Sequence, residues 1–159
     1  MTTTTELLHI ETTRFGPVEV DPDFVITLPE GIIGFENCRR YAVLRHNEGS
    51  PFRWLQSIDD GAVAFPVMDP HIFLPDYQPP IPAVDRADLG LSNDDQMLLL
   101  TIITVPRGNP RAMTANLLGP VVINAETRVG RQVVLEDTCR YTTRYDLVPA
   151  LSGAIASAA

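Results

Sequence analysis

Short runs of strand-favouring residues, each closed by turn-favouring residues, recur along most of the chain and constrain its fold more than any other feature. Valine, isoleucine, threonine and aromatic residues fill the runs, and glycine, proline, asparagine or aspartate follow them. The predicted strands cover residues 7–13, 18–20, 24–28, 41–46, 52–58, 62–68, 97–105, 116–124, 131–135 and 140–145. About ten short strands with minimal helix predict an all-β barrel or sandwich, and we favour a small closed or partly open β-barrel.

The run at residues 97–105 is the most apolar part of the chain. Its near-continuous leucine and isoleucine content predicts burial on both faces, as in a central strand. A core helix is the alternative, but the β-branched residues before Pro106 favour a strand.

Prolines and glycines mark the departures from this pattern. Pro66 lacks the N–H that a sheet ladder needs, which predicts an edge or a bulge. The five prolines of residues 69–82 predict an extended, packed segment, and residues 84–91 fit one or two helical turns. In the segment 28–41, which we call the glycine corner, Gly31 and Gly34 can take positive φ, and the apolar residues between and after them are expected to plug the core.

A length of 159 residues, with 45% hydrophobic content, suits one compact domain. We assign residues 1–147 to a single β-barrel domain. Residues 148–159 form an alanine-rich tail, which we expect to be disordered or loosely helical because it has little to bury.

The charge pattern disfavours several classes of function. The formal net charge of −8 disfavours binding to nucleic acid or anionic membranes. All twelve basic residues are arginine, which excludes a Schiff-base lysine and a P-loop lysine. Residues 101–145 are the exception to the acidic balance, with six arginines against three acids.

Cysteine usage and the N-terminal sequence indicate the compartment. Cys38 and Cys139 show no CxxC or zinc-ligand spacing, and no signal-peptide pattern is present. No apolar run approaches the roughly 18 residues of a membrane-spanning helix. We therefore expect a reduced, cytoplasmic protein.

No motif of the chain indicates catalysis. His9, His46 and His71 lack metal-ligand spacing, so we expect neither a metal nor a cofactor. Ser57 could join Asp69 and His71 as a triad, but no nucleophile signature surrounds it. A ligand-binding or hydrolytic barrel using Trp54, Asp69 and His71 stays open as an alternative, and so does a core role for Trp54.

Two segments are candidate contact surfaces. Phe73 and Tyr77 lie among prolines and could present rigid aromatic area to a partner, or could form a buried strap over one end of the barrel. Arg107 and Arg111 lie on a polar loop that serves either solubility or interaction.

Several separated stretches resemble the FliW flagellar assembly factor family. The stretches are residues 28–36, 55–57, 73–77, 114–124, 132–135 and 141–144. The resemblance covers residues 7–147, and the segment from Asn116 to Asn124 is its most specific part.

The resemblance implies a non-enzymatic β-barrel that binds flagellin in the cytoplasm. It also implies binding to the RNA-binding translational regulator CsrA, which relieves repression of flagellin mRNA. We expect a monomer, with Phe73, Tyr77, Arg107, Arg111 and Asn116 near partner surfaces. A structural subunit of a secretion apparatus would instead form a stable homo-oligomer.

Overall fold

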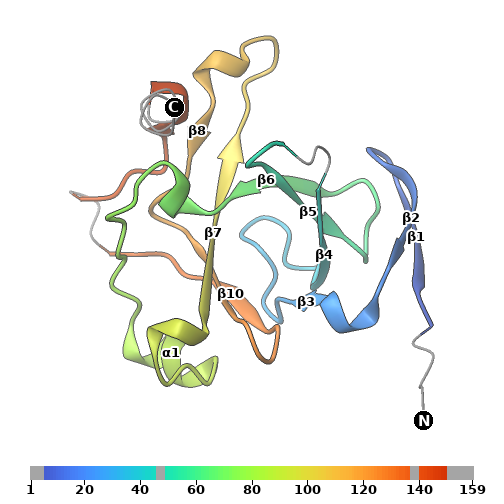
Figure 1. The fold of residues 1–159 in the computed structure, drawn as a ribbon, viewed down its shortest axis with the longest axis horizontal. Coiled ribbons are helices and arrows are strands. Elements are labelled where there is room, and N and C mark those ends of the chain that lie inside the picture. Colours follow the sequence, from blue (N-terminus) through green and yellow to red (C-terminus); the bar gives the residue numbers. More distant parts are fainter. Residues whose placement is uncertain (1–5, 46–48, 137–139, 150–159) are drawn as a thin grey trace.

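A computed structural model of the chain describes residues 6–45, 49–136 and 140–149 and shows a mostly β fold (Figure 1). The strands are β1 (Leu8–Thr12), β2 (Gly16–Val20), β3 (Ile26–Thr27), β4 (Arg40–Leu44), β5 (Arg53–Ser57), β6 (Ala64–Met68), β7 (Met97–Thr104), β8 (Thr114–Ala115), β9 (Val121–Asn124), β10 (Gly130–Gln132) and β11 (Tyr145–Asp146). The helical pieces are α1 (Ala83–Asp88) and the 3-10 turns η1 (Pro22–Phe24), η2 (Pro70–Ile72), η3 (Asp94–Gln96) and η4 (Pro110–Ala112). The predicted scarcity of helix is confirmed.

The main sheet is antiparallel throughout and runs in the order β10-β9-β7-β6-β5-β4-β3. Strand β8 pairs with both β7 and β11. Among the described residues, strand pairing between the two ends of this order is limited to an isolated bridge between Thr27 and Val129, where the Thr27 amide donates to the carbonyl of Arg128 at 2.9 Å. Within the described residues, therefore, no continuous ladder closes the sheet into the predicted barrel.

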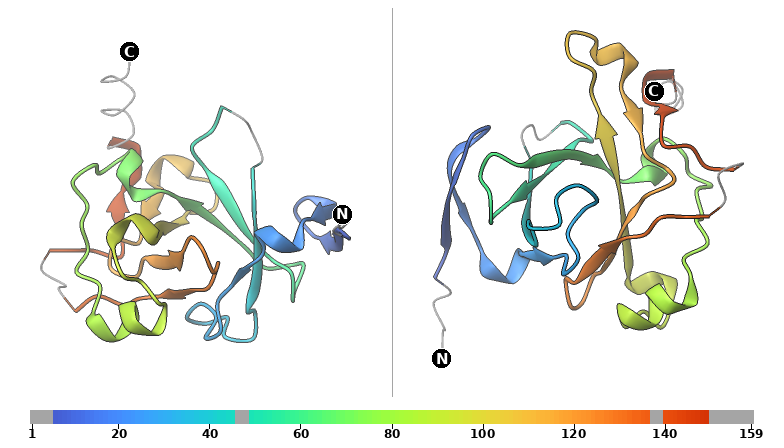
Figure 2. Two further views of the ribbon diagram at one scale, coloured as in Figure 1. Left: turned by 60° about the horizontal axis from the view of Figure 1, so that its bottom comes forward. Right: turned by 180° about the vertical axis from the view of Figure 1, so that it is seen from behind.

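Strands β1 and β2 form a separate hairpin beside the main sheet (Figures 1 and 2). Its Ile10 and Val20 pack against Ala42 of β4 in a small core cluster. The amide of Thr13 donates to the carbonyl of Gly61 at 3.0 Å, which ties the hairpin to the turn after β5. The strands predicted at residues 7–13 and 18–20 are confirmed.

Strand β7 occupies the centre of the sheet, as its apolar run predicts, because it pairs with β6, β8 and β9. Its two faces differ. Leu99, Thr101 and Ile103 are buried, whereas Leu98 is 47% exposed and the next two residues on its face are half-buried. The prediction of burial on both faces is wrong, because no described element fully covers the second face.

Proline and helix predictions match the structure more closely. Pro66 lies opposite Trp54 of β5, while β7 pairs only with Val67 and Met68, so Pro66 faces an edge as predicted. Helix α1 falls within the segment predicted as one or two helical turns, apart from its first residue.

Several predicted strands extend beyond those observed, including the ones at residues 116–124 and 131–135. The predicted strand 24–28 shrinks to β3, because Asp21 accepts a hydrogen bond from the Asp23 amide and starts η1 just before it. The predicted strand 140–145 is reduced to β11, which pairs with β8.

The glycine corner contains the positive φ angles predicted for it, +68° at Gly31 and +89° at Gly34. The Phe35 amide donates to the Ile32 carbonyl at 2.6 Å and closes a tight turn. Ile32 is buried, but Ile33 and Phe35 are exposed. Only part of the expected plug is therefore present, because so tight a turn directs one side chain inward and the others outward.

No helix among the described residues is long and apolar enough to span a membrane. His46, Cys139 and residues 150–159 of the tail lie outside the described residues.

Candidate functional site

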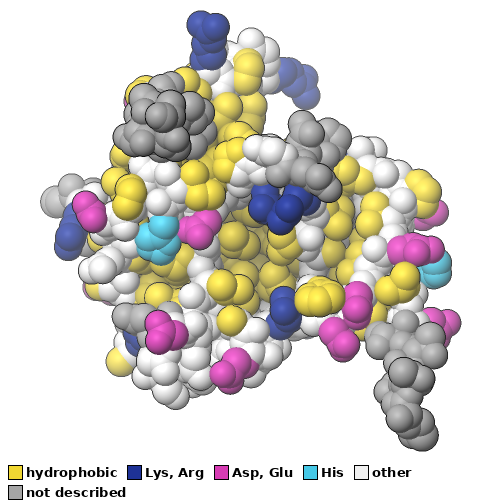
Figure 3. Space-filling view, in the orientation of Figure 1, with side chains coloured by type: hydrophobic (Ala, Val, Ile, Leu, Met, Phe, Trp, Pro, Cys, Tyr) yellow, Lys and Arg dark blue, Asp and Glu magenta, His cyan; other side chains and the backbone are white. Residues whose placement is uncertain are grey.

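The open face of β7 forms the floor of a groove with a volume of about 740 Å³. Figure 3 shows this region as a hollow of apolar side chains at the centre of the molecule. Exposed Leu98 from β7, Val43 from β4 and Ile72 from η2 contribute to it. Exposed large apolar residues gathered in one concavity are typical of a surface that a ligand or partner covers.

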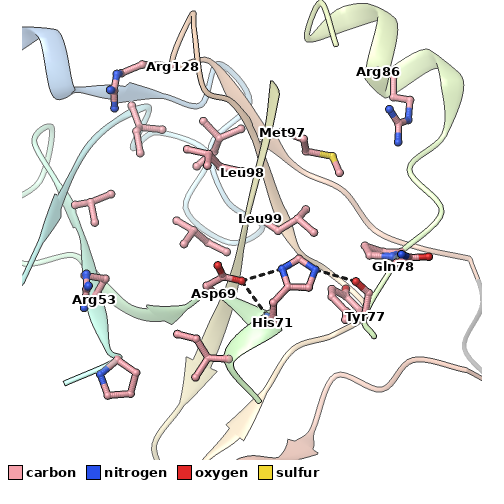
Figure 4. A pocket seen from close by; sticks show the side chains of 17 residues that line it. Arg53, Asp69, His71, Tyr77, Gln78, Arg86, Met97, Leu98, Leu99 and Arg128 are labelled. Carbon is pink, nitrogen blue, oxygen red and sulfur yellow. Dashed lines mark hydrogen bonds and ion pairs between the residues drawn. The ribbon is translucent and has the colours of Figure 1, made fainter. Parts of the chain in front are cut away.

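Charged residues around this floor are mainly basic. Arg53, Arg86 and Arg128 line the groove together with a single carboxylate, that of Asp69. In Figure 4, Arg53 and Arg128 lie on one side of the exposed β7 residues, and His71 and Tyr77 lie on the other. The groove is thus a positively charged region in a chain with a net charge of −8.

Arg53 and Arg128 interact with neutral groups. Nη1 of Arg53 donates to the carbonyls of Ser50 at 2.9 Å and Phe52 at 3.0 Å. The Arg128 guanidinium lies 5.0 Å from the ring centroid of Phe24. Among the described residues, neither guanidinium has a carboxylate within ion-pair distance.

Asp69 and His71 lie on the side of the groove opposite Arg53 and Arg128, where hydrogen bonds hold them in place. Oδ1 of Asp69 accepts from the amide of His71 at 2.9 Å and lies 3.0 Å from its Nδ1. Nε2 of His71 lies 2.9 Å from the carbonyl of Tyr77. These bonds fix the start of the proline-rich segment, because they join η2 to a residue six positions further on.

Asp69 and His71 meet in the groove, but Trp54 and Ser57 do not join them there. Trp54 lies outside the groove, with the Arg14 guanidinium 4.1 Å from its ring centroid and Phe15 edge-on at 5.8 Å. Ser57 Oγ is buried away from the groove and accepts from the Asp60 amide at 3.0 Å. Among the described residues, no three histidine, cysteine or acidic side chains gather as metal ligands.

Phe73 and Tyr77 lie in the core, as in the buried-strap alternative. Phe73 is 5% exposed and stacks on Tyr145 with the ring centroids 5.7 Å apart. Tyr77 is 2% exposed, and its hydroxyl donates to the carbonyl of Leu117 at 2.6 Å. Burial raises the pKa of the Tyr77 phenol. Both residues therefore stabilise the proline-rich segment and offer almost no surface to a partner.

The other candidate contact residues divide between a turn and an exposed tip. Oδ1 of Asn116 accepts from the amides of Leu118 at 3.1 Å and Gly119 at 2.9 Å, which forms the turn before β9. Arg107 and Arg111 are exposed on the connection between β7 and β8, which precedes the turn at Asn116. The structure thus separates these residues from the groove, which none of them lines.

Sequence reasoning missed the groove itself. The sequence predicts burial for the β7 residues of its floor, because a continuous apolar run looks the same whether or not its second face is covered. The one signal in the sequence is that β7 carries more large apolar residues than the strands beside it can cover.

Comparison with known proteins supplies the family. The model of the FliW protein family matches residues 9–147. The chain belongs to the FliW family. It is 43% identical over 141 residues to the flagellar assembly factor FliW of Syntrophus aciditrophicus (strain SB), covering 89% of this chain and 88% of that protein. It is 39% identical over 140 residues to the flagellar assembly factor FliW of Natranaerobius thermophilus, covering 88% of this chain and 92% of that protein.

The fold agrees with this assignment. A crystal structure of the flagellar assembly factor FliW superposes with a TM-score of 0.79 at 29% identity, covering 88% of this chain and 96% of that chain. The names of these relatives describe an assembly factor and not an enzyme. The prediction of a non-enzymatic flagellar assembly factor is therefore confirmed at the level of the family.

Proposed function

We propose that the chain binds flagellin and the translational regulator CsrA in the cytoplasm, and that its binding to CsrA allows flagellin mRNA to be translated. Membership of the FliW family supports a role in flagellar assembly. The chain acts in this scheme as a monomeric binding protein. Exchange between the two partners requires that their sites overlap or are coupled.

The apolar groove is the observation that carries the proposal. Leu98, Val43 and Ile72 are exposed together on its surface. Covering apolar area is the main favourable term in most protein association, at about 25 cal/mol per Å². A partner segment seated on β7 would bury side chains that the chain itself leaves open.

The tip between β7 and β8 is a second proposed contact. Arg107 and Arg111 are exposed there. Exposed arginines on a protruding turn can form paired hydrogen bonds with a partner's carboxylates. Phe73 and Asn116 lie outside the groove, and Tyr77 lines it with only 2% of its surface exposed, so all three support binding in this scheme by holding the fold.

Co-purification tests the function. The chain is mixed with flagellin, with CsrA, and with both, and the retained complexes are quantified together with the mass of the free chain by light scattering. We expect each partner to be retained when it is added alone, and the sample with both partners reports whether binding of one affects binding of the other. Retention of neither partner contradicts the proposal, and a stable homo-oligomer contradicts the monomer.

A pair of aspartate substitutions tests the groove. Leu98→Asp places a charge on the floor, and Val134→Asp places the same charge on an apolar residue that is 53% exposed and outside the groove. We expect Leu98→Asp to weaken binding of at least one partner about tenfold, or about 1.4 kcal/mol, and Val134→Asp to leave both affinities unchanged. Equal effects of the two substitutions contradict a role for the groove.

A further inference from the structure

We infer that the groove receives a segment of flagellin in which carboxylates lie among apolar side chains, and that CsrA binds to a different, acidic surface. This inference rests on the function proposed above and adds the chemistry of the ligand and the sorting of the two partners. It follows from the charges around the groove and from their partners within the chain.

Arg53 and Arg128 are the residues that define the ligand. Each guanidinium interacts with neutral groups and keeps its charge unpaired by any carboxylate of the described residues. Arginine carries five N–H donors, and the two Arg53 bonds both use Nη1. Both residues therefore retain donors for the carboxylates of a bound segment.

Arg128 is held in position at a conformational cost. It has a φ of 61° and is the only non-glycine residue with positive φ among those described. A left-handed conformation is unfavourable for residues other than glycine, because Cβ approaches the following carbonyl oxygen. Residues held in this way concentrate at ligand-binding sites, where surrounding contacts fix them. Here the Thr27 amide donates a hydrogen bond to the Arg128 carbonyl, and the ring of Phe24 packs against the Arg128 guanidinium.

The floor between these arginines determines the rest of the ligand. Leu98, Leu100 and Val43 offer no side-chain hydrogen-bonding group. A ligand that was only charged would lose water at this floor without compensation. The ligand must therefore combine apolar side chains for the floor with carboxylates for the rim.

Charge also decides which of the two proposed partners fits. A protein that binds RNA presents arginine and lysine to the phosphates. Such a surface would be repelled at a rim that already carries Arg53 and Arg128. The remaining surface is the better match for CsrA, because 19 of the 20 acidic residues and only 9 of the 12 arginines lie outside the groove.

Two double substitutions test this assignment. Arg53→Gln/Arg128→Gln removes two charges from the rim, and Arg39→Gln/Arg144→Gln removes two charges from exposed positions outside the groove. Affinities for intact flagellin and for CsrA are measured by calorimetry, after thermal unfolding shows that each variant is folded. We expect the rim variant to lose at least about tenfold in affinity for flagellin and to keep its affinity for CsrA, and the control variant to keep its affinity for flagellin.

Peptides identify the segment. Overlapping synthetic peptides covering the flagellin of the same organism are screened by fluorescence anisotropy. We expect the bound peptides to contain aspartate or glutamate between apolar residues. Changing those acids to lysine should abolish binding, and Arg53→Glu/Arg128→Glu should restore it.

The outcomes separate this inference from the proposed function. If wild-type protein retains neither partner, the function itself is wrong. If it binds flagellin but the rim variant binds flagellin equally well, or loses CsrA instead, the function stands and the assignment of the groove is overturned. Bound peptides without carboxylates also overturn it.

Discussion

At the scale of single residues, the two glycines of the corner have the same backbone requirement and different surroundings. A Cβ atom at Gly31 would lie 2.6 Å from the Glu36 Cα atom and 2.7 Å from the Phe35 carbonyl oxygen. A Cβ atom at Gly34 would meet nothing within 4 Å. Both residues have positive φ, so alanine is strained at either position.

We therefore predict that Gly31→Ala and Gly34→Ala differ in their effect on stability. Gly34→Ala should lower the free energy of unfolding by about 1 kcal/mol, from backbone strain alone. Gly31→Ala should lower it by about 3 kcal/mol, because the backbone of the turn must also move. Urea denaturation of the two variants measures the difference. Equal losses would show that the close approach at Gly31 relaxes without cost.

At the scale of elements, two adjacent residues of the proline-rich segment have different roles, one in stability and one in binding. Phe73 is 5% exposed and stacks on Tyr145, whereas Ile72 is 40% exposed and lines the groove. We predict that Phe73→Ala lowers the free energy of unfolding by about 3 kcal/mol and leaves partner affinity unchanged where the variant is folded. Ile72→Ala should lower the free energy of unfolding by less than about 1 kcal/mol and should weaken binding of the partner that occupies the groove.

Urea denaturation and calorimetric titration of both variants at low temperature check this pair. Wild-type stability in Phe73→Ala together with lost binding would show that Phe73 contacts a partner directly. Unchanged binding in Ile72→Ala would show that η2 does not contact the partner in the groove.

The strands show how far sequence predicts this structure. The sequence predicts β7, the strands β1 and β2 and the edge position of Pro66, because these depend on local propensity and on the missing proline N–H. The exposure of Leu98 was not predictable in the same way, because it depends on which distant segments cover β7. Phe73 and Tyr77 became core residues for the same reason, since their neighbours Tyr145 and Leu117 are remote in the chain.

At the scale of the whole molecule, one bridge joins the two ends of the main sheet and also shapes the groove. The amide of Thr27 points away from β4 and donates to the carbonyl of Arg128. Ile26, immediately before Thr27, lines the groove together with Arg128. The contact that brings the sheet ends together thus also fixes one of the two rim arginines.

We predict that Thr27→Pro breaks this contact and that Thr27→Ala preserves it. Proline removes the donating N–H and leaves the Arg128 carbonyl without its partner, which should lower the free energy of unfolding by about 2 kcal/mol. Alanine keeps the amide and should cost no more than about 1 kcal/mol. Hydrogen exchange should quicken at β9 and β10 in Thr27→Pro alone, and flagellin affinity should fall with it, because Arg128 loses its support. Unchanged exchange at β9 and β10 in Thr27→Pro would show that the sheet ends hold their places without the bridge.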